Sequence, residues 1–237
     1  MTHPERIIPD ETEPGVVALH LKRYVFAEPW CRGKEVLDLA CGAGYGTAHL
    51  ARVASHVVGG DVSEEAIAYA RRRYAADNVE FRLLDAADLP FEDDSFDCVV
   101  SFETIEHLPD RATYLAEVAR VLRPDGTYVV STPRAEMTTE RPDNPFHRVE
   151  YSERDLRAVL AQHFGRVRVY GQRRVESRRH RALRRLDVLG LRRRVPALRR
   201  VAVLTGTPPT EAVTLDDVAI TPGDTAHATE LIAVCHL

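Results

Sequence analysis

The sequence predicts an α/β fold, in which helices cover both faces of a mostly parallel sheet of seven strands whose last strand is antiparallel. Two observations predict it. Short apolar runs of strand length alternate with longer segments of helical periodicity along most of the chain. The connections between them are short up to residue 172, as they are in parallel sheets built from alternating strands and helices.

The expected strands are apolar runs bounded by polar or turn residues. They lie at 35–40, 56–62, 79–86, 96–103, 127–133, 166–172 and 230–237. Cys98 and Cys235 fall inside two of these runs, where a buried thiol is expected. About 55 residues separate the last two strands, which is long for a connection. We therefore expect a helical insertion between the sixth and seventh strands.

The expected helices have apolar residues at helical spacing and, in places, capping signals. They lie at 16–30, 46–54, 63–75, 111–122 and 152–164. Ser63 is a typical N-cap with Glu64 and Glu65 in the first turn. These elements divide the chain into an N-terminal helical lid (1–33), a core (34–172), an Arg-rich helical insertion (173–226) and a final core strand (227–237).

The composition is that of a globular protein. The chain has 237 residues, of which 44% are hydrophobic and 29% charged, with a formal net charge of -4. The four cysteines form no CxxC pair, so neither a disulfide framework nor a zinc cluster is expected. The N-terminus is polar and no apolar run reaches membrane-spanning length. We expect a cytoplasmic protein without a membrane partner.

A glycine-rich turn follows the first expected strand in the stretch VLDLACGAGYG, residues 36–46. Gly42, Gly44 and Gly46 alternate with other residues there, which does not fit the G-x-G-x-x-G spacing of dinucleotide-binding proteins. Glycines between a strand and a helix let the backbone approach a ligand closely at the carboxyl edge of the sheet. The turn therefore predicts a small-molecule site at this edge.

The same stretch resembles motif I of class I S-adenosylmethionine (SAM)-dependent methyltransferases, D-x-G-x-G-x-G, with Ala40 in place of the first glycine. Further stretches in family order extend the resemblance over residues 34–135. It implies a Rossmann-like sheet, SAM as the cofactor, an acidic residue on the ribose (Asp61) and a pair at the adenine (Asp85 and Ala86). It implies these cofactor-binding residues: Tyr24, Asp38, Ala40, Gly42, Gly44, Asp61, Val62, Asp85, Ala86 and Phe102.

The stretch SFETIEHLPD follows the fourth expected strand, beside the position expected for the reactive methyl group. A helix there would place Glu103, Glu106 and His107 on one face. With His147, these side chains suit a divalent metal such as Mg²⁺, Mn²⁺ or Zn²⁺. The pattern resembles ubiquinone-pathway O-methyltransferases and Hen1-type RNA 2′-O-methyltransferases.

Two other interpretations of this stretch stay open. In one, His107 is a metal-free general base that Glu106 orients. In the other, the two glutamates only favour a helix start and His147 is an ordinary loop residue. Because His107 is functional in two of the three interpretations, we predict His107 and Glu106 as the catalytic residues.

The arginine-rich segment 173–200 interleaves arginines with apolar residues. It is typical of structural cover or a dimer contact, and it leaves open an anionic acceptor, RNA or an acidic membrane surface. We predict a SAM-dependent methyltransferase that methylates a hydroxyl of a small molecule, such as a sugar or phenolic natural-product intermediate. The alternatives are an RNA 2′-O-methyltransferase, a small-molecule N-methyltransferase and a SAM-binding regulator without catalysis. A homodimer is also expected.

Overall fold

The computed structural model describes residues 6–175 and 213–237 of the chain. Its helices are α1 (Pro14–Cys31), α2 (Tyr45–Leu50), α3 (Glu64–Tyr74), α4 (Arg111–Val121) and α5 (Glu153–Leu160), with 3-10 turns η1 (Ile105–His107) and η4 (Leu215–Asp217). Its strands are β1 (Glu35–Leu39), β2 (His56–Asp61), β3 (Val79–Leu83), β4 (Phe96–Phe102), β5 (Leu122–Pro133), β6 (Arg166–Arg174), β7 (Val218–Pro222) and β8 (Glu230–His236).

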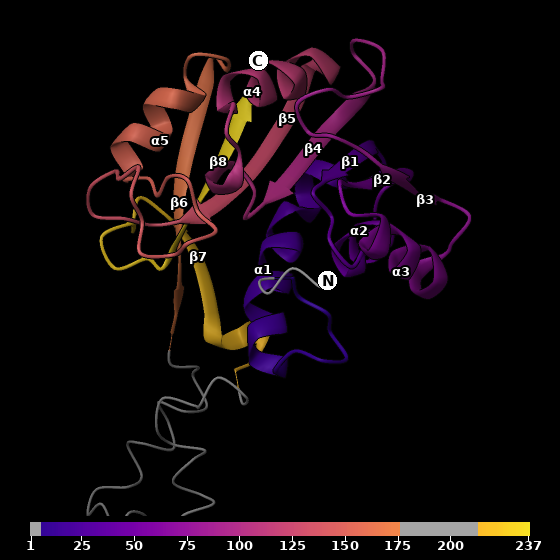
Figure 1. The fold of residues 1–237 in the computed structure, drawn as a ribbon, viewed down its shortest axis with the longest axis horizontal. Coiled ribbons are helices and arrows are strands. Elements are labelled where there is room, and N and C mark those ends of the chain that lie inside the picture. Colours follow the sequence, from indigo (N-terminus) through magenta and orange to yellow (C-terminus); the bar gives the residue numbers. More distant parts are fainter. Residues whose placement is uncertain (1–5, 176–212) are drawn as a thin grey trace, which may run out of the picture.

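The strands form one sheet in the order β3-β2-β1-β4-β5-β8-β6-β7 (Figure 1). The pairs from β3 to β5 are parallel, and β8 runs antiparallel to both β5 and β6. The predicted fold class is confirmed, including the antiparallel last strand. The order reverses direction at β1 and β4, so the loops after these two strands leave toward opposite sides and create a crevice between them.

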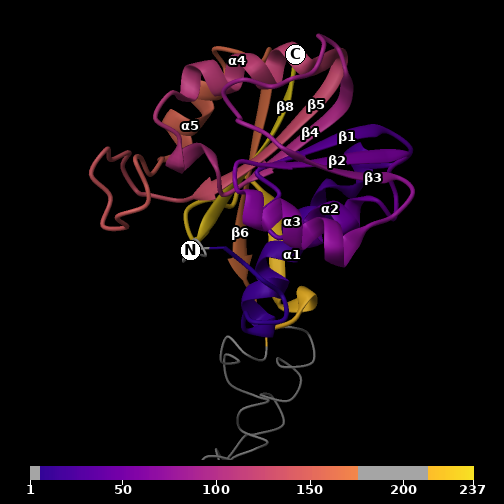
Figure 2. The ribbon, with the colours of Figure 1, turned by 45° about the vertical axis from the view of Figure 1, so that its right-hand side comes forward.

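Helices cover both faces of the sheet, as Figure 2 shows, with α4 and α5 on one side and α1, α2 and α3 on the other. Alternation within the strands explains the two layers, because neighbouring side chains point to opposite faces. In β4, Val99 belongs to the core that α4 and α5 cover, whereas Cys98 and Val100 face α1. Burying each aliphatic side chain of this kind contributes about 1.5–3 kcal/mol to the free energy of unfolding.

The sheet has an eighth strand, β7, within the range 173–226 that the sequence analysis assigns to a helical insertion. That prediction is wrong for residues 218–222, which pair antiparallel with β6, and β6 itself continues to Arg174. β7 is a short edge strand that ends in Pro222, a residue that edge strands tolerate. Residues 176–212, which hold most of the predicted insertion, lie outside the described residues.

Helix α1 lies within the predicted N-terminal lid, but it is also part of the core. Tyr24, Ala27 and Cys31 are buried against strands β1, β4 and β5 and the last strand. All four cysteines are buried and unpaired, which confirms the expected buried thiols at Cys98 and Cys235. Within residues 6–175 and 213–237, no helix is long and apolar enough to cross a membrane.

Candidate active site

A cavity of about 360 Å³ lies at the carboxyl ends of the parallel strands. Residues that follow β1, β2, β3 and β4 form its wall, together with α1 and the segment before it. This volume lies within the range of small-molecule sites. It brings together the following predicted cofactor-binding residues: Tyr24, Ala40, Gly42, Asp61, Val62, Asp85, Ala86 and Phe102. Asp38 and Gly44 do not line it.

The turn after β1 has a left-handed backbone at Ala40 (φ 63°), Gly42 (φ 54°) and Gly44 (φ 82°). Ala40, which replaces the first glycine of the motif, therefore occupies a conformation that favours glycine. Gly44 does not line the cavity, and its lack of a side chain serves the packing of the turn. A Cβ there would lie 2.6 Å from the Cβ of Ala70 on α3, so only glycine lets α3 approach the turn.

Tyr24 and Asp38 form a buried pair beneath the cavity wall. The Tyr24 hydroxyl donates to Oδ1 of Asp38 at 3.3 Å, and the Thr47 hydroxyl donates to Oδ2 at 2.6 Å. The Tyr24 ring packs edge-on against Phe102, with 4.9 Å between the ring centroids. Burial raises the pKa of Asp38 to about 7, although its hydrogen bonds oppose the shift.

Asp61 and Asp85 stand at the ends of β2 and β3, on the same side of the cavity. The two oxygens of Asp61 accept the backbone N–H groups of Gly42 and Ser63, each at 2.9 Å. Oδ1 of Asp85 accepts the N–H of Ala87 at 2.9 Å. These bonds fix both carboxylates on the cavity wall, where their oxygens can accept further hydrogen bonds from a ligand. Val62 is 75% exposed, so it offers an apolar surface without core packing.

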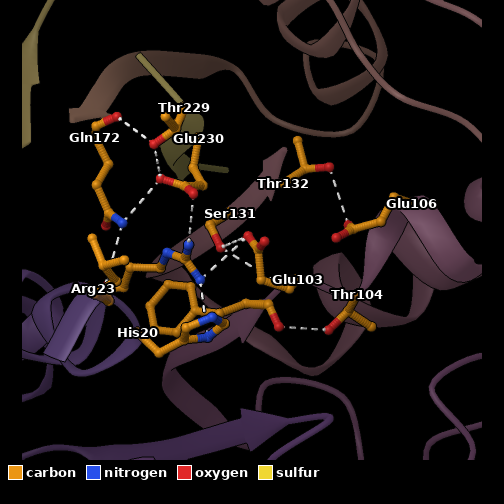
Figure 3. Close-up of polar contacts among 12 residues, drawn as sticks. His20, Arg23, Glu103, Thr104, Glu106, Ser131, Thr132, Gln172, Thr229 and Glu230 are labelled. Atoms are coloured by element: carbon orange, nitrogen blue, oxygen red, sulfur yellow. Dashed lines mark hydrogen bonds and ion pairs between the residues drawn. The ribbon is translucent and has the colours of Figure 1, made fainter. Parts of the chain in front are cut away.

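Glu103, Glu106 and His107 do not share a helix face, so the geometric basis of the predicted four-residue metal site is wrong. Glu103 has a left-handed backbone (φ 52°), and only a single 3-10 turn follows it. Its Oε1 accepts the Ser131 hydroxyl at 2.7 Å, whereas Oε2 of Glu106 accepts the Thr132 hydroxyl at 3.1 Å (Figure 3). The two carboxylates are therefore held by different partners.

Glu106, His107 and His147 do come together. One ligand atom from each lies within 4.8 Å of the others. Glu106 is fully buried, and its Oε1 is 3.9 Å from Nε2 of His107 and accepts no hydrogen bond in the described parts of the chain. Burial raises the pKa of Glu106 well above its ordinary value, and the charge of Glu103 adds to the shift.

The two histidine rings have defined partners. Nδ1 of His107 lies 3.0 Å from the carbonyl oxygen of Phe146. A carbonyl only accepts, so Nδ1 donates, and in the neutral ring Nε2 carries the lone pair. Nδ1 of His147 lies 2.9 Å from Oε1 of Glu150, and its Nε2 lies 3.0 Å from the Asn144 amide nitrogen. In both neutral rings Nε2 is therefore the acceptor nitrogen. That of His147 accepts from the Asn144 amide, and His107 lines the cavity.

Some residues at the cavity were not predicted from the sequence. His20 on α1 and Tyr45 at the start of α2 both line the wall, and Arg23 supports it from behind. The spacing of three between His20 and Arg23 places them on one helix face, and this spacing was the signal available in the sequence. It was weak, because a charged residue on a helix usually faces solvent.

Comparisons with known proteins agree with this geometry. Residues 37–130 match a family model described as a methyltransferase domain. A Mycolicibacterium smegmatis protein named as a probable SAM-dependent methyltransferase is 44% identical over 133 residues, which cover 55% of this chain and 51% of that protein. A Mycobacterium tuberculosis protein with the same description is 41% identical over 160 residues, which cover 66% of this chain and 58% of that protein.

A solved structure from Thermotoga maritima shares the fold. It is described as a SAM-dependent methyltransferase, a possible histamine N-methyltransferase, and has a TM-score of 0.65 at 14% identity. The alignment covers 94% of this chain and 91% of that chain. This chain spans about half the length of the curated relatives that it matches. Residues 37–130 thus match a model of methyltransferase domains, and the relatives that align with this chain are named as probable SAM-dependent methyltransferases.

Proposed function

We propose that the protein transfers the methyl group of SAM to a hydroxyl of a small-molecule acceptor. One observation carries this proposal. The imidazole of His107 lines the same cavity as the residues assigned to the cofactor, in a tautomer whose Nε2 accepts a proton. Hydroxyls are weak nucleophiles until they lose their proton. A hydroxyl acceptor therefore needs a base beside the reactive methyl group.

The proposed reaction is a direct displacement. The acceptor oxygen attacks the methyl carbon in line with the sulfonium, the O–C bond forms, and the C–S bond breaks with its electron pair left on sulfur. The hydroxyl proton passes to Nε2 of His107. The products are a methyl ether, S-adenosylhomocysteine and an imidazolium that returns its proton to water. Positioning in the cavity supplies a large share of the rate enhancement.

Glu106 supports His107 in this proposal. Its raised pKa favours the neutral acid in the resting site. An imidazolium at His107, whose Nε2 lies 3.9 Å from the buried Oε1, favours the ionised carboxylate, so the two charges then stabilise each other. The Phe146 carbonyl holds Nδ1 and so fixes the ring plane. The 3-10 turn and the loop that carries Phe146 are joined by two further bonds, from the N–H groups of Arg148 and Val149 to the Glu106 carbonyl. Glu106 and His107 are thus held in position before an acceptor binds.

The same residues fit a divalent cation, which is the second candidate. Glu106, His107 and His147 would hold it. Nδ1 of His147 donates to the Glu150 carboxylate, and a carboxylate that accepts from the second ring nitrogen is the usual support for a metal-binding histidine. Such an ion supplies Lewis acidity that lowers the pKa of a bound hydroxyl. Glu103 does not join this set, because Ser131 and Arg23 hold its carboxylate elsewhere.

Turnover on an acceptor panel tests the proposal. Catechols, sugars, amines and short RNAs are incubated with SAM, and S-adenosylhomocysteine is measured with and without EDTA and at two salt concentrations. We expect product with a hydroxylated small molecule and little salt dependence. Product only with RNA and a steep loss with salt would contradict it, as would product only with amines. SAM binding without product on any acceptor favours a regulator. Loss with EDTA and recovery with one ion would select the metal-assisted form.

A further inference from the structure

Two cysteine side chains meet in the core between α1 and the sheet. The Sγ atoms of Cys31, the last residue of α1, and Cys98, within β4, lie 3.7 Å apart. Both residues are fully buried, and they belong to the same apolar cluster as Val36 and Val100. They are a pair of nucleophilic groups that the proposed methyl transfer does not use.

The other two cysteines lie apart from this pair. Cys235, on β8, belongs to the core on the opposite face of the sheet. Cys41 lies in the glycine-rich turn, where its Sγ is 3.9 Å from the Gly42 carbonyl oxygen. The fold therefore selects Cys31 and Cys98 from the four cysteines as the two whose sulfur atoms are neighbours.

The distance between the two sulfur atoms suits a disulfide after a small movement. A disulfide bond is about 2.05 Å long, so the two Sγ atoms must approach each other by about 1.7 Å. Cys98 is held on both sides by strand pairing, with β1 and with β5. Cys31 ends its helix, and the next residue, Arg32, is already extended (φ −61°, ψ 119°). Bond formation therefore requires a shift of the end of α1 and leaves the sheet in place.

The same helix end controls the access of an oxidant. A thiol buried among apolar side chains is shielded and stays protonated, so the pair is unreactive while α1 is packed on the sheet. Pro29, two residues before Cys31, has no N–H group, so the last turn of α1 lacks one backbone hydrogen bond. We expect this turn to open locally more often than the paired strands beneath it. Each opening exposes the two thiols together.

We infer that Cys31 and Cys98 form a redox lock, in which a peroxide converts the two thiols to a disulfide that ties the end of α1 to β4. One sulfur attacks a peroxide oxygen, the O–O bond breaks, and a sulfenic acid and one water form. The second sulfur attacks the sulfenic sulfur, the S–S bond forms, and the S–O bond breaks with release of a second water. The two thiols lose two electrons and two protons, and the peroxide is reduced to water.

The lock acts on the cavity through α1. His20 and Tyr24 line the cavity, and Cys31 ends the same helix. A disulfide to β4 suppresses the local opening of this helix, so one wall of the cavity is held more firmly in the oxidised protein. This effect depends neither on the identity of the acceptor nor on that of the cofactor.

Peptide mapping by mass spectrometry, before and after treatment of the folded protein with hydrogen peroxide, tests the inference. We expect one cross-link, between the peptides that contain Cys31 and Cys98, whose mass is lower by two hydrogen atoms, with the thiols of Cys41 and Cys235 unchanged. In hydrogen exchange, the backbone amides in the last turns of α1 should exchange about tenfold more slowly in the oxidised protein. Dithiothreitol should reverse both changes.

Cys235→Ala is the matched control, because it removes a buried thiol outside the pair. It should keep the cross-link and the slower exchange, whereas Cys31→Ala should lose both. Four free thiols after peroxide treatment of the folded wild-type protein would overturn the inference, as would a cross-link to Cys41 or Cys235. Oxidation of single cysteines to sulfinic acid in place of the disulfide would also overturn it. A Cys31–Cys98 cross-link with unchanged exchange in α1 would refute the lock.

Discussion

We predict that Asp38 makes SAM binding depend on pH. The pKa of this buried carboxyl is about 7 in the ligand-free protein. SAM carries positive charge on its sulfonium and ammonium groups, and a positive charge near a carboxyl lowers its pKa. Binding should therefore release the proton that Asp38 holds. Between pH 8 and pH 6 the ionised fraction at a pKa of 7 falls from about ten elevenths to about one eleventh, so the dissociation constant should rise about tenfold.

The stability of the ligand-free protein should respond in the opposite direction. Burial raises the pKa of Asp38 above the ordinary 3.8, so the folded chain holds a proton that the unfolded chain releases between about pH 4 and pH 7. This contribution to stability is complete below pH 4 and is lost as the pH rises through 7. Asp38→Asn removes the charge, and at pH 8 it should raise the free energy of unfolding by about 4 kcal/mol at most.

Titration calorimetry at pH 6, 7 and 8, with thermal unfolding at the same pH values, checks both effects. We expect a tenfold change in SAM affinity for the wild-type protein and a flat profile for Asp38→Asn. An unchanged wild-type affinity from pH 6 to 8, or the same slope in Asp38→Asn, would refute the reasoning.

Three further predictions concern single residues. Ala40→Gly should raise the free energy of unfolding by about 1 kcal/mol. The left-handed backbone costs a non-glycine residue about 1–2 kcal/mol, and the greater freedom of glycine in the unfolded chain offsets part of the gain. An unchanged free energy of unfolding in a denaturant titration would contradict this prediction. Gly46→Ala should destabilise the protein by about 1–3 kcal/mol, because the new Cβ would lie 1.9 Å from the Tyr24 ring; an unchanged unfolding midpoint argues against this packing. Glu106→Gln should lower turnover about 10- to 100-fold, because an imidazolium at His107 loses its charged neighbour. SAM affinity, measured by calorimetry, should stay within about twofold of the wild type. Normal turnover in this variant would show that Glu106 has no part in the reaction.

The sheet and the cofactor end of the cavity were predictable because local patterns specify them. Apolar runs of strand length and the capped helix at Ser63 appear at the expected places, and the Ser63 hydroxyl accepts the Ala66 N–H. Strand ends in a parallel sheet meet at one edge, and Asp61 and Asp85, which the resemblance assigns to one ligand, both line the cavity there.

Features set by tertiary contacts were not predictable from the sequence. The turn at Glu103 becomes left-handed where Ser131, on another strand, holds both its N–H and its carboxylate. The burial of Arg23 depends on Glu103 and Glu230, which come from distant parts of the chain. Strand β7 was missed because a short run that ends in proline is a weak strand signal.

The measurement that tests the central claim most directly is methyl transfer by His107→Ala, compared with SAM binding by the same preparation. Methyl transfer is measured on the hydroxyl acceptor that gives the highest product yield with the wild-type protein. We predict turnover about 10²- to 10⁴-fold lower than wild type, the usual contribution of a general base, with SAM affinity within about twofold. Turnover equal to the wild type in His107→Ala would contradict the assignment of His107 as the group that activates the acceptor.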